Sequence, residues 1–86
     1  MTEDTRLKRL RIRSWRRGTK EMDLILGGFC DAELARLSED EIALYEELLS
    51  ENDHDLYQWV SGQAAAPRRV AELLSRIAAH ARGSAA

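Results

Sequence analysis

The sequence RRGTKEMD, residues 16–23, separates a basic N-terminal segment from the apolar part of the chain. Gly18 predicts a break between two helices, because glycine is a poor helix-interior residue and readily takes the positive φ of a helix C-terminus. Thr19 is placed to cap the following helix, whose positive dipole end favours Glu21 and Asp23 in the first turn. The stretch therefore predicts one helix before Gly18 and another after it.

Apolar residues at helical spacing extend this prediction in both directions. Before the junction we expect a helix that starts near Arg6, capped by Thr5, with a partly apolar side. After it, a clear stripe falls at positions i, i+3, i+4 and i+7: Met22, Ile25, Leu26 and Phe29. Gly27 and Gly28 weaken this helix by about 1 kcal/mol each. The stripe continues beyond them, so we expect the helix to continue as well.

Three further helices are marked by their termini. Ser38 and Glu41 form a capping box that opens a third helix. Asp53 is suited to capping a short fourth helix over residues 53–61, which Gly62 ends. Pro67 suits the first turn of a fifth helix, because its missing N–H costs nothing there. The sequence thus predicts an all-α fold, a compact bundle of about five short helices.

Length and composition agree with a single small domain. The chain has 86 residues, which leaves no room for a second core. We expect one domain over residues 1–86, with residues 1–5 and 83–86 flexible. A single cysteine, Cys30, excludes an internal disulfide. No apolar stretch approaches the roughly 18 residues that span a bilayer, and no secretory signal opens the chain. We therefore expect a cytoplasmic location.

The net charge of −2 hides a strong asymmetry. Residues 6–17 hold seven cations and no acid, whereas residues 31–55 hold ten acids and one base, Arg36. The two blocks either face each other or lie on opposite solvated faces of the fold. A third interpretation reserves the basic surface for a partner.

The sequence offers little for catalysis or metal binding. Cys30, His54 and His80 each stand alone, without the paired spacing of metal ligands. We expect Cys30 in the core, His54 in solvent and His80 on the outer face of the last helix. Glu21 and Asp23 point away from each other on a helix and cannot act as a local acid/base pair. No nucleophile elbow or phosphate-binding loop occurs, so we predict that the protein is not an enzyme.

Three motifs, taken in order and spacing over residues 6–62, resemble one family. They are Arg17-Gly18-x-x-Glu21, then Leu37-Ser38-x-x-Glu41, then Asp53-x-Asp55-Leu56-Tyr57-x-Trp59 followed by Gly62. The family is that of the small succinate dehydrogenase assembly factors that promote flavinylation, of SdhE type and also described as antitoxin CptB-like. Its fold is a five-helix bundle, in agreement with the helices predicted from the termini.

The resemblance implies a function. Such proteins bind the flavoprotein subunit of succinate dehydrogenase, with fumarate reductase as a further client, and promote covalent attachment of FAD to that subunit. This implies a chaperone that holds no FAD stably itself, is monomeric, and neither binds nucleic acid nor inserts into a membrane. The residues implied in partner binding are Arg17, Gly18 and Glu21, with Arg16, Lys20 and Asp23 at the rim.

Several alternatives stay open at this point. Gly18 can be a simple helix terminator, and Arg17 with Glu21 an internal surface ion pair worth under about 1 kcal/mol. Tyr57 and Trp59 can pack in the core or contact the client. The protein as a whole can instead be an antitoxin-like regulator of a small toxin partner, or a nucleic-acid-binding protein that uses its basic first helix.

Overall fold

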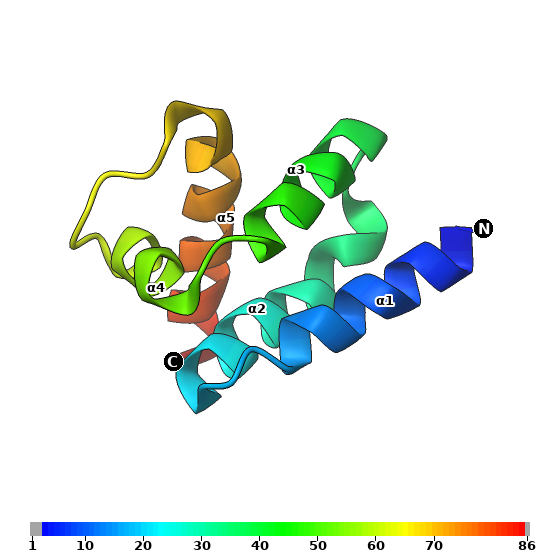
Figure 1. Cartoon of the computed structure of the whole chain (residues 1–86), viewed down its shortest axis with the longest axis horizontal. Helices are drawn as coiled ribbons and strands as arrows, with labels where there is room; N and C mark the ends of the chain where they lie inside the picture. The colour runs from blue at the N-terminus through cyan, green and yellow to red at the C-terminus, as the bar shows by residue number, and fades with distance from the viewer. Residues whose placement is uncertain (1–2, 86) are drawn as a thin grey trace.

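The computed structural model describes residues 3–85, which form five α-helices and one short 3-10 helix (Figure 1). The elements are α1 (Glu3–Trp15), α2 (Lys20–Glu33), the 3-10 helix η1 (Leu34–Arg36), α3 (Glu39–Leu49), α4 (Asp53–Ser61) and α5 (Arg68–Ala85). No strand occurs within these residues, so the predicted all-α bundle of five helices is confirmed.

The helices pack into one body of 37 × 26 × 23 Å. Helix α1 lies along α2, while α2, α3 and α4 all contact α5. Figure 1 shows α4 and α5 grouped at the end of the molecule opposite the marked N-terminus. The junction after α1 and the connection between α3 and α4 lie near each other, because Arg17 hydrogen-bonds to the Leu49 and Glu51 carbonyls.

The predicted helix termini of α2, α3 and α4 rest on local hydrogen bonds. The Thr19 hydroxyl accepts from the Met22 N–H at 3.3 Å, and Ser38 and Glu41 form the complete capping box. Gly62 ends α4 with φ 83°, a left-handed conformation that glycine adopts without steric cost. These expectations are confirmed, because each depends only on residues a few positions apart.

The N-termini of two helices differ from the sequence-based expectation. Helix α1 begins at Glu3 rather than near Arg6, so Thr5 lies within its first turn and does not cap it. Asn52, not Asp53, caps α4, and its side chain accepts from the Asp55 N–H at 2.9 Å. The Asp53 carboxylate is instead bound to an arginine distant in sequence.

Helix α5 begins directly after Pro67 and continues to Ala85. The backbone of residues 83–85, which we expected to lie beyond the last helix, is therefore helical. Flexibility of the two chain ends stays a prediction, and residues 1, 2 and 86 lie outside the described part.

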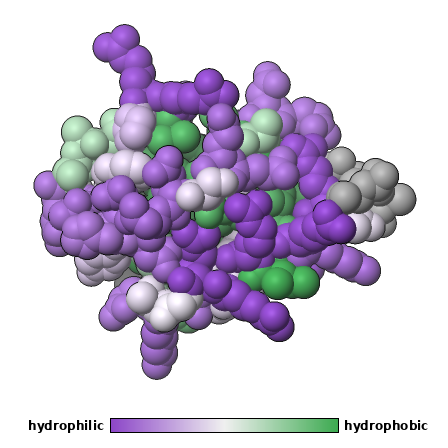
Figure 2. All heavy atoms as spheres, in the orientation of Figure 1, coloured by the Kyte–Doolittle hydropathy of each residue, from purple (hydrophilic) through white to green (hydrophobic). Residues whose placement is uncertain are grey.

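The core collects the apolar stripes of all five helices. Tyr45 is fully buried, and its hydroxyl lies 2.7 Å from that of Ser14 on α1 and 3.2 Å from the Leu26 carbonyl on α2. The other buried apolar residues are Leu10, Met22, Leu26, Phe29, Cys30, Leu34, Leu37, Ile42, Leu48, Leu49, Leu56, Val70, Leu73, Leu74 and Ile77. The face drawn in Figure 2 is mainly hydrophilic, with small apolar patches between polar side chains.

Helix α2 runs through both glycines, as expected, and Gly27 is also a point of close approach. A Cβ atom on Gly27 would lie 2.3 Å from the Trp15 indole, whereas one on Gly28 would meet only His80, at 3.8 Å. Gly27 thus lets the ring at the end of α1 rest directly on α2. Trp15 also donates from its indole nitrogen to Asp31, at 3.2 Å.

The basic and acidic blocks face each other in part. Arg6 bonds to Glu39 at 2.9 Å and also to Glu46. Arg11 lies 3.3 Å from Asp31. These ion pairs join α1 to α3 and to α2. Within the described residues, no helix is both long and apolar enough to cross a membrane.

Candidate functional site

Arg17 turns inward and links two connections of the bundle. Its side chain is only 11% exposed. The guanidinium donates to Asp53 Oδ1 at 2.8 Å, to the Leu49 carbonyl at 2.6 Å and to the Glu51 carbonyl at 2.7 Å. Leu49 is the last residue of α3, where helix carbonyls lack intrahelical partners, and Glu51 lies in the connection that follows. Arg17 therefore donates hydrogen bonds both to carbonyls after α3 and at its last residue and to a carboxylate at the start of α4.

Asp23 holds the backbone of the same junction. Its Oδ1 accepts from the Arg17 N–H at 2.6 Å, and its own N–H donates to the Thr19 carbonyl at 3.0 Å. Asp23 is half-buried. The turn between α1 and α2 is thus tied to α2 by Asp23 and to the α3–α4 connection by Arg17.

Gly18 stands at the exposed apex of this turn. Its φ is 101°, and no atom lies within 4 Å of the position that a Cβ would take. The residue must be glycine for its backbone conformation, although there is room for a side chain. Any residue with a side chain would strain the turn through its backbone conformation, although it would meet no neighbouring atom.

The other predicted partner-binding residues face solvent. Arg16, Lys20 and Glu21 are exposed, and in the described part of the chain Glu21 forms no ion pair. Arg17 pairs with Asp53 instead, so the alternative of an internal Arg17–Glu21 ion pair is wrong. The six residues predicted from sequence thus separate into an outward group and two inward residues, Arg17 and Asp23.

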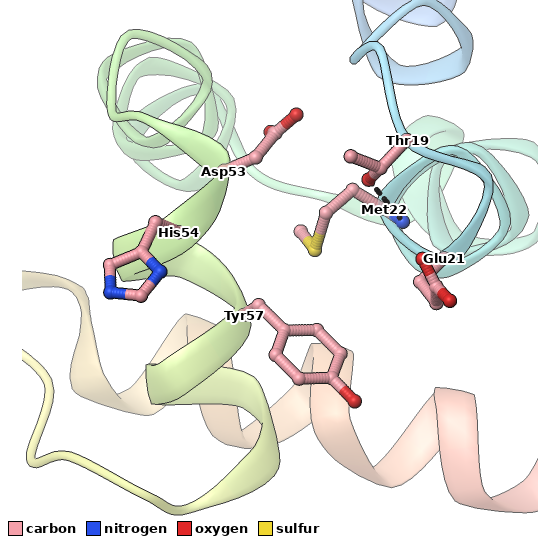
Figure 3. A pocket seen from close by; sticks show the side chains of 6 residues that line it. All are labelled: Thr19, Glu21, Met22, Asp53, His54 and Tyr57. Carbon is pink, nitrogen blue, oxygen red and sulfur yellow. Dashed lines mark hydrogen bonds between the residues drawn. The ribbon is translucent and has the colours of Figure 1, made fainter.

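A groove of about 440 Å³ opens beside Glu21, between the start of α2 and α4. Figure 3 shows side chains from α4 on one side and from the start of α2 on the other. The lining residues are Thr19, Glu21, Met22, Asp53, His54 and Tyr57. Sequence reasoning placed His54 in solvent but did not associate it with Glu21, because the two are brought together only by tertiary packing.

The two aromatic residues of α4 have different environments. Tyr57 is 40% exposed and lines the groove. Trp59 is half-buried and packs against the core. Of the two alternatives for this pair, core packing applies to Trp59. Tyr57 lies at the surface, where it is available to a partner.

The remaining titratable candidates lie away from the groove. Cys30 is buried, as expected, and burial raises the pKa of its thiol. His80 is half-buried with its ring edge-on to Phe29, at 6.0 Å between centroids; its predicted place on an outer face was wrong. Across the described residues, no group of three or more His, Cys, Asp or Glu side chains is arranged to hold a metal.

The amino-acid sequence of the chain is similar to those of known proteins. A family model described as "Flavinator of succinate dehydrogenase" matches residues 8–81 of the chain. The "FAD assembly factor SdhE" of Legionella pneumophila (strain Lens) is 35% identical over 74 residues, which cover 86% of this chain and 94% of that protein. The family-model match over residues 8–81 includes the exposed turn and all five helices in part or whole.

Mitochondrial proteins resemble the same region. "Succinate dehydrogenase assembly factor 2, mitochondrial" of Aspergillus terreus is 39% identical over 64 residues, covering 72% of this chain and 22% of the relative. The protein of that name from Schizosaccharomyces pombe is 35% identical over 68 residues, covering 79% of this chain and 49% of the relative. Neither an antitoxin-like regulator nor a nucleic-acid-binding protein finds support among these relatives.

Proposed function

Because the chain belongs to the family of flavinators of succinate dehydrogenase, we propose that it is an assembly factor for that enzyme. In this role it binds the flavoprotein subunit and promotes covalent attachment of FAD to it. The observation that carries the proposal is the exposed turn at Gly18 and Glu21. The three hydrogen bonds of the Arg17 guanidinium fix this turn to the rest of the bundle.

The turn has the properties of a protein-binding edge. Gly18 projects no side chain and has open space around it, so the backbone of a client can approach closely. Glu21 offers a carboxylate with no cation partner among the described residues, while Arg16 and Lys20 offer exposed cations nearby. Charges left unpaired within a chain are available to orient a partner and to suppress wrong ones.

Arg17 and Asp23 contribute to this surface indirectly. Their polar groups are directed into the protein, where they fix the turn between α1 and α2. A preorganised turn loses less conformational freedom on binding, which favours affinity without any added contact. The resemblance implied Arg17 in partner binding, and we propose that it acts by positioning the turn and not by contacting the client itself.

The chemistry of flavin attachment is assigned to the client. The sequence has no dinucleotide-binding fingerprint, so we propose a non-catalytic chaperone that acts without stably bound FAD. It would hold the flavoprotein in the arrangement in which its own residues form the bond. Four further points remain predictions. They are a fumarate reductase flavoprotein as second client, a monomeric state, a cytoplasmic location, and the absence of nucleic-acid or membrane partners.

The test is a reconstitution with the succinate dehydrogenase flavoprotein encoded in the same genome. The flavoprotein, prepared without covalent flavin, is incubated with FAD in the presence or absence of this protein, and covalent flavin is measured by in-gel fluorescence. We expect the protein to increase the fluorescent band and Glu21→Ala to reduce that increase. Glu72→Ala, which removes an exposed acid on α5, is the matched control. An unchanged band with the wild-type protein contradicts the proposed function.

A further inference from the structure

The groove beside Glu21 contains one carboxylate that forms no ion pair within the described residues. Two carboxylates line it, from Glu21 and Asp53. Asp53 is compensated by Arg17, whose Nε lies 2.8 Å from Oδ1. Glu21, which also lines the groove, forms no ion pair in the described part of the chain. A cation entering the groove would therefore meet one carboxylate that is already neutralised and one that is not.

The walls of the groove suit the aliphatic part of a long side chain. Met22, only 1% exposed, contributes an apolar floor. The Tyr57 ring extends from α4 towards the start of α2, across from Glu21 (Figure 3). Arginine and lysine place their apolar stems along such surfaces while their charged heads reach polar groups. A guanidinium or ammonium over an aromatic face gains further electrostatic attraction.

We propose that this groove is a socket for one basic side chain, arginine or lysine, of the flavoprotein client. The side chain would lie between Met22 and Tyr57, with its charged head at Glu21. The inference rests on the proposed function and adds α4 to the client-binding surface. The flavoprotein is the favoured occupant because the groove is continuous with the exposed turn at Gly18 and Glu21.

The first test measures the affinity of the flavoprotein for groove variants by biolayer interferometry at low ionic strength. We expect Tyr57→Ala and Glu21→Lys each to weaken binding by about tenfold or more, as loss of an anchor contact or reversal of an interfacial charge does. The controls are Ile12→Ala, at an exposed apolar residue on α1, and Glu72→Lys on α5, and both should bind within about twofold of wild type. Circular dichroism melts establish that each variant is folded.

The second test identifies the occupant. Tyr57 is replaced by the photoreactive residue p-benzoylphenylalanine, the complex with the flavoprotein is irradiated, and the linked peptides are sequenced by mass spectrometry. We expect a flavoprotein peptide that contains arginine or lysine at or next to the linked position. Replacing that basic residue of the flavoprotein with alanine should weaken its binding to the wild-type protein. The same replacement should have little further effect on its binding to the Glu21→Lys variant.

The outcomes separate this inference from the proposed function. If the wild-type protein stimulates flavinylation but both groove variants bind like the controls, the socket is overturned and the function stands. A linked flavoprotein peptide without a basic residue also overturns it. A link to a second copy of this chain identifies a dimer contact instead and likewise overturns it. If the wild-type protein neither binds nor stimulates the flavoprotein, both proposals fall.

Discussion

Replacing Arg17 with alanine should destabilise the fold far more than replacing Glu21, although both belong to one short motif. The Arg17 side chain is 11% exposed and its Asp53 partner 19% exposed. The variant removes three hydrogen bonds, one to the carboxylate and two to the carbonyls of Leu49 and Glu51. Asp53 is then left largely buried without its cation, and the end of α3 loses its donors.

The magnitude follows from the degree of burial. Removing one partner of a buried ion pair costs about 3–5 kcal/mol. Asp53 is partly reachable by water, so we take the lower end, ~3 kcal/mol. In a domain of this size each kcal/mol lowers the melting temperature by about 4–8 °C, which gives a fall of roughly 12–24 °C. Glu21→Ala removes an exposed side chain and should change stability by less than about 0.5 kcal/mol.

The assay is thermal unfolding followed by circular dichroism, with Arg68→Ala as the control for loss of an exposed arginine. A double-mutant cycle with Arg17→Ala and Asp53→Ala isolates the coupling between the two side chains. An Arg17→Ala protein that melts within about 4 °C of wild type would refute the inward role of this arginine. A coupling energy near zero would refute its pairing with Asp53.

The remaining predictions concern a pair of glycines and the pH dependence of stability. Gly27→Ala should lower the melting temperature, because its Cβ would meet the Trp15 indole at 2.3 Å, whereas Gly28→Ala has ordinary contacts and should stabilise α2 by up to about 1 kcal/mol in the same melts; equal shifts would contradict the close approach. The backbone hydrogen bond from Ser38 lowers the pKa of Glu41 below its ordinary value of 4.5. The folded state thus binds the Glu41 proton less tightly than the unfolded state, so the stabilisation is present above pH 4.5 and is lost as pH falls through the lower folded-state pKa. The difference between melts of wild type and Glu41→Gln should shrink as pH falls from 4.5 through the lower folded-state pKa of Glu41, and a difference independent of pH would exclude this linkage.

Local features of the chain were largely predictable from residues close in sequence. The caps at Thr19 and Ser38 and the stop at Gly62 involve neighbours within a few positions, so their hydrogen bonds follow from residue type and spacing. The predicted cap was wrong where the capping residue has a second partner in the fold. Asp53 illustrates this, because Arg17, 36 positions away, claims its carboxylate and leaves the cap to Asn52.

The sequence alone therefore determined the class of fold, the number of helices, the break at Gly18 and the family resemblance. Only the tertiary structure decided that Arg17 faces inward while Glu21 faces outward, and that Glu21 shares a groove with His54 and Tyr57. Hydrophobic periodicity and capping are interactions along the chain and can be read from it. Which charged side chain is buried depends on how helices distant in sequence pack together, and that packing is not encoded in any single stretch.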